Sequence, residues 1–282
     1  MPHTSPTAPV PPGPVRRRPA PGLPAAGTAL LGAAFAATAT LVCALVAAGT
    51  TRPRLQNADE RWLALMGGPH DGLPLAAATV LDWFGGPLGA VVPLALVAVL
   101  CVRRRWWSLL YFLTAYLGGS ALVVQVVKYA VDRPRPAGPL VRVDHGSFPS
   151  GHAFGAALLV VLVGALFVTR ARRPLWWSLG ALFTTAMMWS RTWLHAHWLS
   201  DTVAGALAGF ATGLLLWCAF APLLGREASR HAVRRTESGS EEAAGPDHPV
   251  FRIRPRPPAR RIHVNGRILK RGVSPYDTRE PG

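Results

Sequence analysis

Long apolar runs recur along this chain and constrain its fold more than any other feature. A helix needs about 20 mostly apolar residues to cross a bilayer. Six stretches approach or exceed that length, at about 27–50, within 73–102, and at about 106–130, 151–169, 176–193 and 198–224. Several begin or end at tryptophan, which is typical of membrane interfaces. The sequence therefore predicts an all-α, polytopic membrane protein built as a six-transmembrane-helix bundle.

Both ends of the chain differ in composition from this central region. Residues 1–23 are rich in proline and carry a triple arginine, and residues 225–282 are polar and rich in proline and arginine. Such segments cannot bury a core, so both are predicted to be disordered tails around a membrane domain at 24–224. A signal peptide is the competing interpretation of the N-terminus, but the run at 27–50 is too long for one and favours an uncleaved first span.

The positive charge follows the ends of the spans. The net charge is +16, and arginines cluster at 16–18, 103–105 and 170–173. With six spans these clusters fall on one side, which the positive-inside rule makes cytoplasmic, together with both termini. Other arginines, at 52, 54 and 61, oppose this bias. The pattern favours a multi-pass protein of the cell membrane, with the lipid bilayer as its partner and no nucleic acid.

The stretch from Ser190 to Asp201 carries candidate chemistry at the mouth of an apolar run. His197 and Asp201 are four residues apart, so on a helix they share a face and can hydrogen-bond. A carboxylate that holds one imidazole nitrogen leaves the other free as a base or nucleophile. Arg191 adds a planar cation suited to phosphate oxygens. An interfacial helix end with a satisfied histidine explains this stretch equally well when it is taken alone.

Two further stretches carry polar residues at span ends. Lys128 ends the third span, and Arg135 follows seven residues later between two prolines. At the start of the fourth span, Ser150 suits an N-cap, and the backbone N–H groups beside Gly151 can hold a phosphate oxygen next to His152. Each has a plain alternative, a snorkelling lysine with a basic loop in one case and a simple helix cap in the other.

The predicted topology brings the three stretches together. The third span ends, the fourth begins, the fifth ends and the sixth begins on the same face of the membrane, outside the cytoplasm. The residues that meet there are Lys128, Arg135, Ser150, Gly151, His152, Arg191, His197 and Asp201. Three unrelated helix caps have no reason to converge, so a functional site is the better interpretation.

The three stretches read K-x6-R-P, P-S-G-H and S-R-x5-H-x3-D. In this they resemble the type-2 phosphatidic acid phosphatase superfamily, which also includes vanadium haloperoxidases. All three motifs are complete and in the family's order, and the resemblance covers roughly residues 25–224. Arg133 and His195 lie outside the matched positions and are given no catalytic role.

The resemblance implies a role for each matched residue. His197 attacks phosphorus to form a phosphohistidine, while Asp201 fixes its tautomer and stabilises the imidazolium. Lys128, Arg135 and Arg191 neutralise the phosphoryl oxygens, helped by Ser150 and the N–H of Gly151. His152 protonates the leaving oxygen and then activates water. The protein itself supplies three cations, so no metal or other cofactor is expected.

The expected activity is hydrolysis of a lipid phosphate or diphosphate. Phosphatidate, phosphatidylglycerol phosphate and polyprenyl diphosphate share the same head chemistry, so the sequence does not choose among them. A lipid phosphotransferase would share every motif. A vanadate-dependent haloperoxidase would use the same pocket, although six spans argue against it, and a non-enzymatic scaffold or transporter would tolerate the loss of residues that are all present. The oligomeric state is left open.

A glycine ridge continues from the catalytic pair along the sixth span. Steps of four residues from His197 lead to Asp201, Gly205, Gly209 and Gly213. Small residues at this spacing allow close approach of membrane helices, so this face is predicted to point into the bundle. A chain that is simply rich in glycine and alanine is the alternative.

Overall fold

The computed structural model describes residues 24, 27–48 and 53–243, and every regular element in these ranges is a helix. In chain order they are α1 (Thr28–Ala47), α2 (Gln56–Leu65), α3 (Gly72–Gly85), η1 (Pro87–Ala90), α4 (Val91–Val102), α5 (Trp106–Leu113), η2 (Thr114–Val126), α6 (Val127–Val131), α7 (Gly151–Leu166), η3 (Arg170–Arg172), α8 (Arg173–Trp193) and α9 (Leu199–Ala243). The all-α prediction is therefore confirmed for the described residues. The tail predicted at 1–23 lies outside them.

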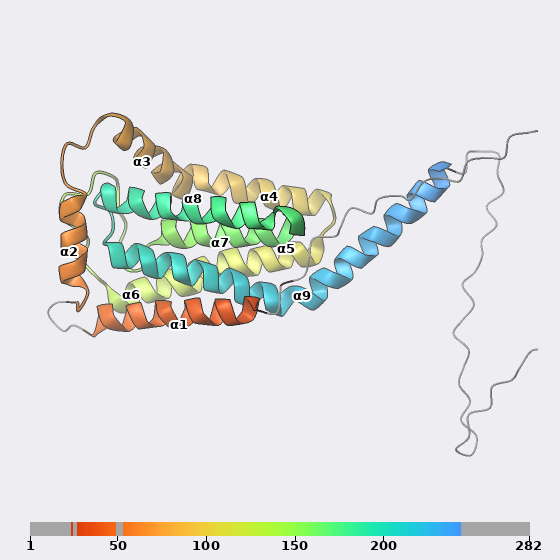
Figure 1. Ribbon diagram of the computed structural model, residues 1–282, viewed down its shortest axis with the longest axis horizontal. Coiled ribbons are helices and arrows are strands. Elements are labelled where there is room, and N and C mark those ends of the chain that lie inside the picture. The colour runs from red at the N-terminus through yellow and green to blue at the C-terminus, as the bar shows by residue number, and fades with distance from the viewer. Residues whose placement is uncertain (1–23, 25–26, 49–52, 244–282) are drawn as a thin grey trace, which may run out of the picture. The chain divides into compact units, whose positions relative to one another are not determined.

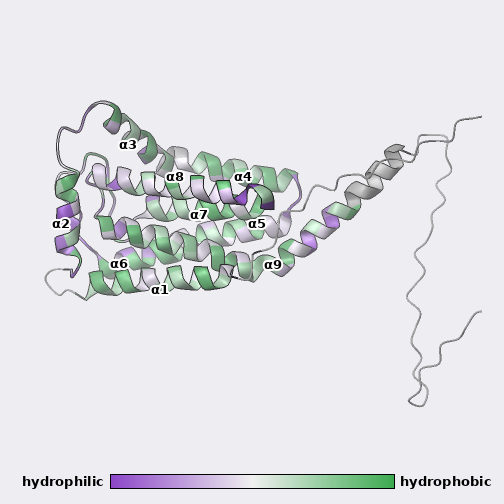
Figure 2. Cartoon of the chain, viewed as in Figure 1, coloured by the Kyte–Doolittle hydropathy of each residue, from purple (hydrophilic) through white to green (hydrophobic). Residues whose placement is uncertain are grey.

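Three helical segments are long and apolar enough to cross a membrane: Thr28–Ala47, Trp106–Val131 and Leu199–Val233. Two shorter apolar helices, α4 and α7, accompany them. Large apolar side chains point outward along the bundle, including Leu94, Leu117 and Leu182, each more than half exposed. Hydrophobic residues dominate the bundle helices, whereas α2 is markedly polar (Figure 2). An outer surface of this kind suits a lipid environment.

The bundle helices run alongside one another and alternate in direction, so their ends gather at two opposite ends (Figure 1). One end holds the end of α6, the start of α7, the end of α8 and the start of α9. Helix α2 lies across this same end, at a steep angle to the rest. The helix termini predicted to share one face of the membrane thus do lie at one end of the bundle.

Helix α7 forms the centre of the packing, with eleven of its sixteen residues buried. The glycine ridge of α9 lies directly against it. A Cβ atom added at Gly205 would lie 2.4 Å from the carbonyl oxygen of Ser150, and one added at Gly209 would lie 2.3 Å from that of Phe154. At Gly213 the nearest atoms are those of Val161, at 2.8 Å. The prediction that this face points into the bundle is confirmed, and only glycine permits so close an approach.

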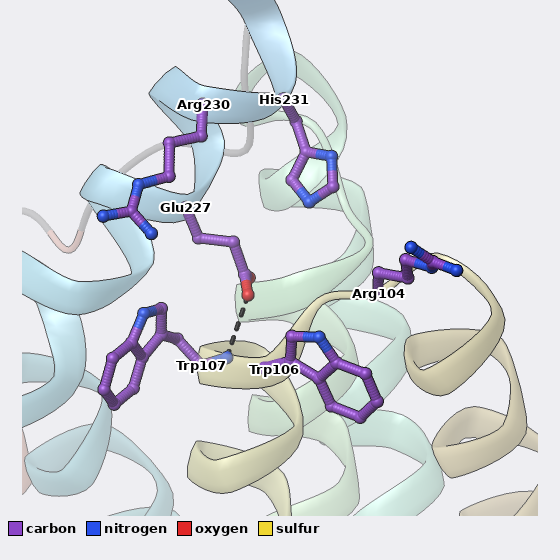
Figure 3. A pocket seen from close by; sticks show the side chains of 6 residues that line it. All are labelled: Arg104, Trp106, Trp107, Glu227, Arg230 and His231. Atoms are coloured by element: carbon purple, nitrogen blue, oxygen red, sulfur yellow. Dashed lines mark hydrogen bonds between the residues drawn. The ribbon is translucent and has the colours of Figure 1, made fainter. Parts of the chain in front are cut away.

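The opposite end of the bundle is tied together by Glu227 of α9. Its carboxylate accepts hydrogen bonds from the backbone N–H of Trp107 over 2.9 Å and from the hydroxyl of Ser108, and it pairs with Arg105 at 3.4 Å. Figure 3 shows Glu227 pointing at the start of α5, where an acidic group caps the free N–H groups of the helix. The cavity around it is also lined by Arg104, Trp106, Trp107, Arg230 and His231.

Helix α9 continues well past the predicted start of the C-terminal tail. It runs to Ala243, whereas the tail was predicted to begin at residue 225. Glu227, Arg230 and His231 continue the helix in polar form, so a change in composition did not mark the end of the helix. Two compact units divide the chain, Met1–Arg235 and Thr236–Gly282, and the helix is described in the second unit only as far as Ala243. Residues 244–282 lie outside the described ranges.

Candidate active site

The three motif stretches meet at the end of the bundle that α2 crosses (Figure 1). Lys128 lies in the short α6, and Arg135 lies in the loop that follows it. Ser150 caps α7, Arg191 lies in the last turn of α8, and the turn from α8 into α9 carries His197. The backbone N–H of Ser150 donates to the carbonyl of Asp201 over 3.0 Å, which ties the start of α7 to the start of α9.

His197 is buried and held from both sides of its ring. Its Nδ1 lies 2.7 Å from the carbonyl oxygen of Ser147, which can only accept a hydrogen bond, so Nδ1 carries the proton. Its Nε2 is then unprotonated and accepts a hydrogen bond from Arg135 Nη1 over 3.3 Å. Asp201 Oδ2 is farther away, at 3.5 Å from Nδ1. The backbone carbonyl, more than the predicted Asp201, therefore selects the tautomer, and Asp201 supplies negative charge beside the ring.

The environment keeps the His197 imidazole neutral. Burial lowers the pKa of His197 to about 4, and the neighbouring cations Arg191 and Arg135 act in the same direction. The hydrogen bond and negative charge of Asp201 oppose this shift only in part. A neutral imidazole with an unprotonated Nε2 is the form that can act as a nucleophile at neutral pH.

Two of the three predicted phosphate-binding cations share one carboxylate. Lys128 Nζ lies 2.9 Å from both carboxylate oxygens of Asp144, and Arg135 Nη2 donates to the same group. Backbone carbonyls of Ala196 and Gly146 accept from Arg135 over 2.6 and 2.8 Å and fix its orientation. Burial acts to raise the pKa of Asp144, but the hydrogen bond and charge of Lys128, with Arg135, leave that pKa lowered.

The third cation, Arg191, pairs with Asp82 of α3 in the same manner. Its buried Nε has no hydrogen-bond partner among the described residues. The same Asp82 approaches His152. The Nε2 of His152 lies 3.3 Å from the backbone carbonyl oxygen of Asp82 and 3.5 Å from the Asp82 carboxylate. Gly85 makes room for this ring, since a Cβ atom there would lie 1.8 Å from His152 Cδ2. Helix α3 therefore positions both Arg191 and His152.

The start of α7 has the predicted cap. Ser150 is fully buried, and its hydroxyl accepts from the N–H of Ala153 at 3.5 Å. The first N–H groups of a helix have no acceptor within it, so those beginning at Gly151 are available to an anion. All eight predicted site residues thus belong to the segments that meet at this end of the bundle.

Sequence reasoning missed the two carboxylates that hold the cations. Asp82 had a signal, because an acidic residue inside an apolar run is costly in a membrane and usually functional. Asp144 had none, since it precedes the second motif in an ordinary polar loop. Arg133 turns out to contact Asp201 over 2.6 Å. His195 instead packs edge-on against His70, with ring centroids 5.0 Å apart.

The arrangement combines a bare imidazole nitrogen, three cations and a second histidine. Such a set can bind a tetrahedral oxyanion, attack its central atom and protonate a leaving group. Within the described residues no three His, Cys, Asp or Glu side chains gather as metal ligands.

A known protein family matches the part of the chain that carries the motifs. The model of the PAP2 superfamily matches residues 105–223. A curated relative, phosphatidylglycerophosphatase B of Bacillus subtilis (strain 168), is 30% identical over 121 residues, which is 41% of this chain and 57% of that protein. The matched region thus spans less than two thirds of the relative's length.

A solved structure has the same fold. It is the crystal structure of a transmembrane PAP2-type phosphatidylglycerolphosphate phosphatase from Bacillus subtilis. The TM-score is 0.53 at 22% identity, over 70% of this chain and 96% of the other. Family model, relative and fold all agree with the resemblance carried by the three motifs. Residues 105–223 thus match the PAP2 superfamily in sequence, and the fold is that of a PAP2-type phosphatase.

Proposed function

We propose that this protein is an integral membrane phosphatase that hydrolyses a lipid phosphate or diphosphate through a phosphohistidine on His197. The geometry of His197 carries the proposal. Its Nδ1 donates a hydrogen bond to the carbonyl of Ser147 over 2.7 Å, and its unprotonated Nε2 lies 3.3 Å from Arg135 Nη1. An unprotonated nitrogen beside a phosphate-binding guanidinium is close to any phosphoryl group that this guanidinium binds, and can attack its phosphorus once Arg135 bonds to the phosphoryl oxygens instead.

In the first step, Nε2 of His197 uses its lone pair to form the bond to phosphorus, and the bond from phosphorus to the lipid oxygen breaks. His152 gives its proton to that oxygen, so the lipid leaves as an alcohol, or as a monophosphate when the substrate is a diphosphate. The ring of His197 becomes cationic. Asp201, at 3.5 Å from Nδ1, stabilises this charge.

In the second step, His152 takes a proton from water, and the resulting hydroxide attacks phosphorus. The bond between phosphorus and Nε2 breaks, inorganic phosphate leaves, and His197 returns to its neutral form. Each step moves negative charge onto the phosphoryl oxygens, where Lys128, Arg135 and Arg191 stabilise it together with Ser150 and the Gly151 N–H.

Phosphate binding exchanges one set of ion pairs for another. Lys128 and Arg135 are held by Asp144, and Arg191 is held by Asp82. A phosphoryl group carries more charge and more acceptor oxygens than a carboxylate, so it competes well for these donors. With three protein cations around the phosphoryl group, the reaction we propose needs no metal ion.

A lipid substrate is supported by the outward-facing apolar surface of the bundle and by the activity for which the relative is named. That relative is named for phosphatidylglycerophosphate, which makes this lipid the first substrate to test. Phosphatidate and polyprenyl diphosphates present the same head group chemistry and complete the panel.

We propose six membrane spans within a domain of about residues 24–224, with the site on the extracytoplasmic face and both termini in the cytoplasm. Support comes from the arginines at 103–105 and 170–173, which lie where α4 connects to α5 and α7 connects to α8, at the end opposite the site. A cysteine at Gly146 should react with a membrane-impermeant thiol reagent in intact cells, and one at Ala171 should not. The opposite labelling pattern would place the site in the cytoplasm.

The activity is tested with purified protein in detergent, by following phosphate release from the three lipids in the presence of EDTA. We expect release from at least one lipid, competitive inhibition by vanadate, and a loss of about 10³-fold or more in His197→Ala. Activity within tenfold of the unmodified protein in that variant would rule out His197 as the nucleophile. Phosphate that appears on a second lipid instead of in solution would identify a phosphotransferase.

A further inference from the structure

Arg133 is a buried cation near the site that lies outside the family motifs, and both of its terminal nitrogens are paired. Its side chain is only 2% exposed. One terminal nitrogen, Nη1, donates to Asp201 Oδ1 over 2.6 Å and to the hydroxyl of Ser200 over 2.8 Å. The other, Nη2, donates to Asp59 Oδ2 over 2.7 Å and to Gln56 Oε1 over 2.8 Å. The guanidinium therefore joins α2 to the start of α9.

Asp59 completes this link from the α2 side. Its Oδ1 accepts the backbone N–H of Ser200 over 2.8 Å, and its Oδ2 accepts the Ser200 hydroxyl over 2.7 Å. Asp59 is 2% exposed, and Asp201 is not exposed at all. Two acidic groups, one guanidinium and the first turn of α9 thus form one buried, hydrogen-bonded cluster.

The cluster fixes the plane of the Asp201 carboxylate. Arg133 holds its Oδ1, and the backbone N–H of Trp198 donates to its Oδ2 over 2.9 Å. The same Oδ2 lies 3.5 Å from His197 Nδ1. A carboxylate held at both oxygens cannot turn away from the imidazole. The guanidinium also lies over the Trp198 ring, 5.4 Å from its centroid, which holds the arginine itself in place.

The cluster also sets the charge that His197 experiences. A carboxylate buried without a partner takes up a proton rather than remain charged. Arg133 gives Asp201 such a partner, at 2.6 Å. Asp59, Asp201 and Arg133 together carry one net negative charge, which matches the single positive charge that develops on His197 during attack.

We propose, on the basis of the phosphatase function above, that Arg133 is a positioning residue for the reaction, which with Asp59 holds Asp201 ionised and directed at His197. Arg133 does not touch the phosphoryl group in this arrangement. Its loss should therefore change the chemical step and leave binding of a phosphate analogue intact.

The alternative is that Arg133 only joins α2 to the bundle. The pH dependence separates the two roles, because only the positioning role changes how readily the pair of His197 and Asp201 takes up a proton. The other charged or titratable groups facing this pair are Lys128 at the end of α6, Arg135 and Asp144 of the following loop, His152 of α7, Arg191 of α8 and Asp59 of α2. Of these groups only Asp59 contacts Arg133, and Arg133→Lys keeps a positive charge beside it.

The experiment compares Arg133→Met and Arg133→Lys with Arg142→Met, a control that removes an exposed arginine from the same loop. Kinetics are measured from pH 4 to 8, with vanadate inhibition as the measure of phosphate binding. We expect Arg133→Met to lower kcat by about 10–100-fold, which is the effect that loss of an orienting hydrogen-bond partner has in metal sites. Its vanadate inhibition constant should stay within about threefold, and the acid limb of kcat should move to higher pH, because loss of a nearby positive charge makes His197 easier to protonate.

Arg133→Lys keeps the positive charge but not the planar guanidinium fork, whose two terminal nitrogens donate to Asp59 and Asp201. It should therefore keep the acid limb in place and recover part of kcat. An unchanged kcat in Arg133→Met would overturn the inference. So would a lowered kcat in Arg133→Met with an acid limb that has not moved, if Arg133→Lys does not recover kcat. If Arg133→Met fails to fold, Arg133→Lys decides, since full kcat in that variant would refute positioning by the fork. An inactive unmodified protein would instead refute the proposed function, and this inference with it.

Discussion

Replacing Gly205 by alanine should disable the site through helix packing alone. A Cβ atom there would lie 2.4 Å from the carbonyl oxygen of Ser150 and 3.3 Å from its N and C atoms. All three are backbone atoms, so no side chain can turn aside. Ordinary contacts of a Cβ begin near 3.4 Å, and α7 and α9 must therefore separate by about 1 Å at this level, a misplacement that can cost about 10²-fold in rate.

The displacement falls on the groups to which we assign the catalysis. Ser150 caps α7 two residues before His152, and its N–H donates to the carbonyl of Asp201 over 3.0 Å. Moving α7 away from α9 therefore pulls the acid and the cap away from His197. We expect kcat to fall by about 10²-fold, and stability to fall by about 1–3 kcal/mol from overpacking.

Gly155→Ala on α7 is the matched control. Outside the helix's own backbone, no atom lies within 4 Å of a Cβ added at Gly155. Alanine is favoured over glycine inside a helix by about 1 kcal/mol, so this variant should retain full activity and equal or greater stability. Phosphate release and thermal unfolding in detergent are measured for both. Gly205→Ala with kcat within threefold of the unmodified protein would refute the packing argument.

Three further predictions follow from the charges around the site. Because burial lowers the pKa of His197 to about 4 and the neutral ring is the active form, kcat/KM should hold at pH 5 and fall only near pH 4; a midpoint near 6.5 would show an ordinary histidine. Asp144→Asn removes the carboxylate that competes for Lys128 and Arg135, so vanadate should inhibit several-fold more tightly, and weaker inhibition would show that Asp144 instead orders these cations. His152→Ala should lose about 10²–10⁴-fold in the first-turnover burst on phosphatidate but far less on an aryl phosphate, and equal losses would show that His152 is not the acid.

The motifs could be predicted from sequence because each is local and lies at a helix end. His197 and Asp201 are four residues apart, and Ser150 directly precedes its helix, so spacing alone determines their neighbours. The glycine ridge was predictable for the same reason. Alternation of the spans then placed these helix ends together without knowledge of any contact.

The missed residues depend on contacts between distant segments. Arg133 and Asp59 are separated by 74 residues, and Arg191 and Asp82 by 109. No periodicity links such pairs, and α2, which carries Asp59, is a short and polar segment in sequence. The role of Ser147 was also hidden, because its backbone carbonyl, rather than its side chain, holds His197. The length of α9 was missed because its polar final turns have the composition of a tail.

The central claim, that His197 is the nucleophile, is tested most directly by trapping the intermediate. The His152→Ala variant is used because its second step should be slow, so the intermediate accumulates. The variant is mixed with an aryl phosphate and quenched in alkali, where a bond between phosphorus and a histidine nitrogen survives. It is then digested for mass spectrometry. The account predicts phosphate on His197, approaching one per active site, and none in His197→Ala. Phosphate on another residue, or a full first turnover with no modified histidine, would contradict it.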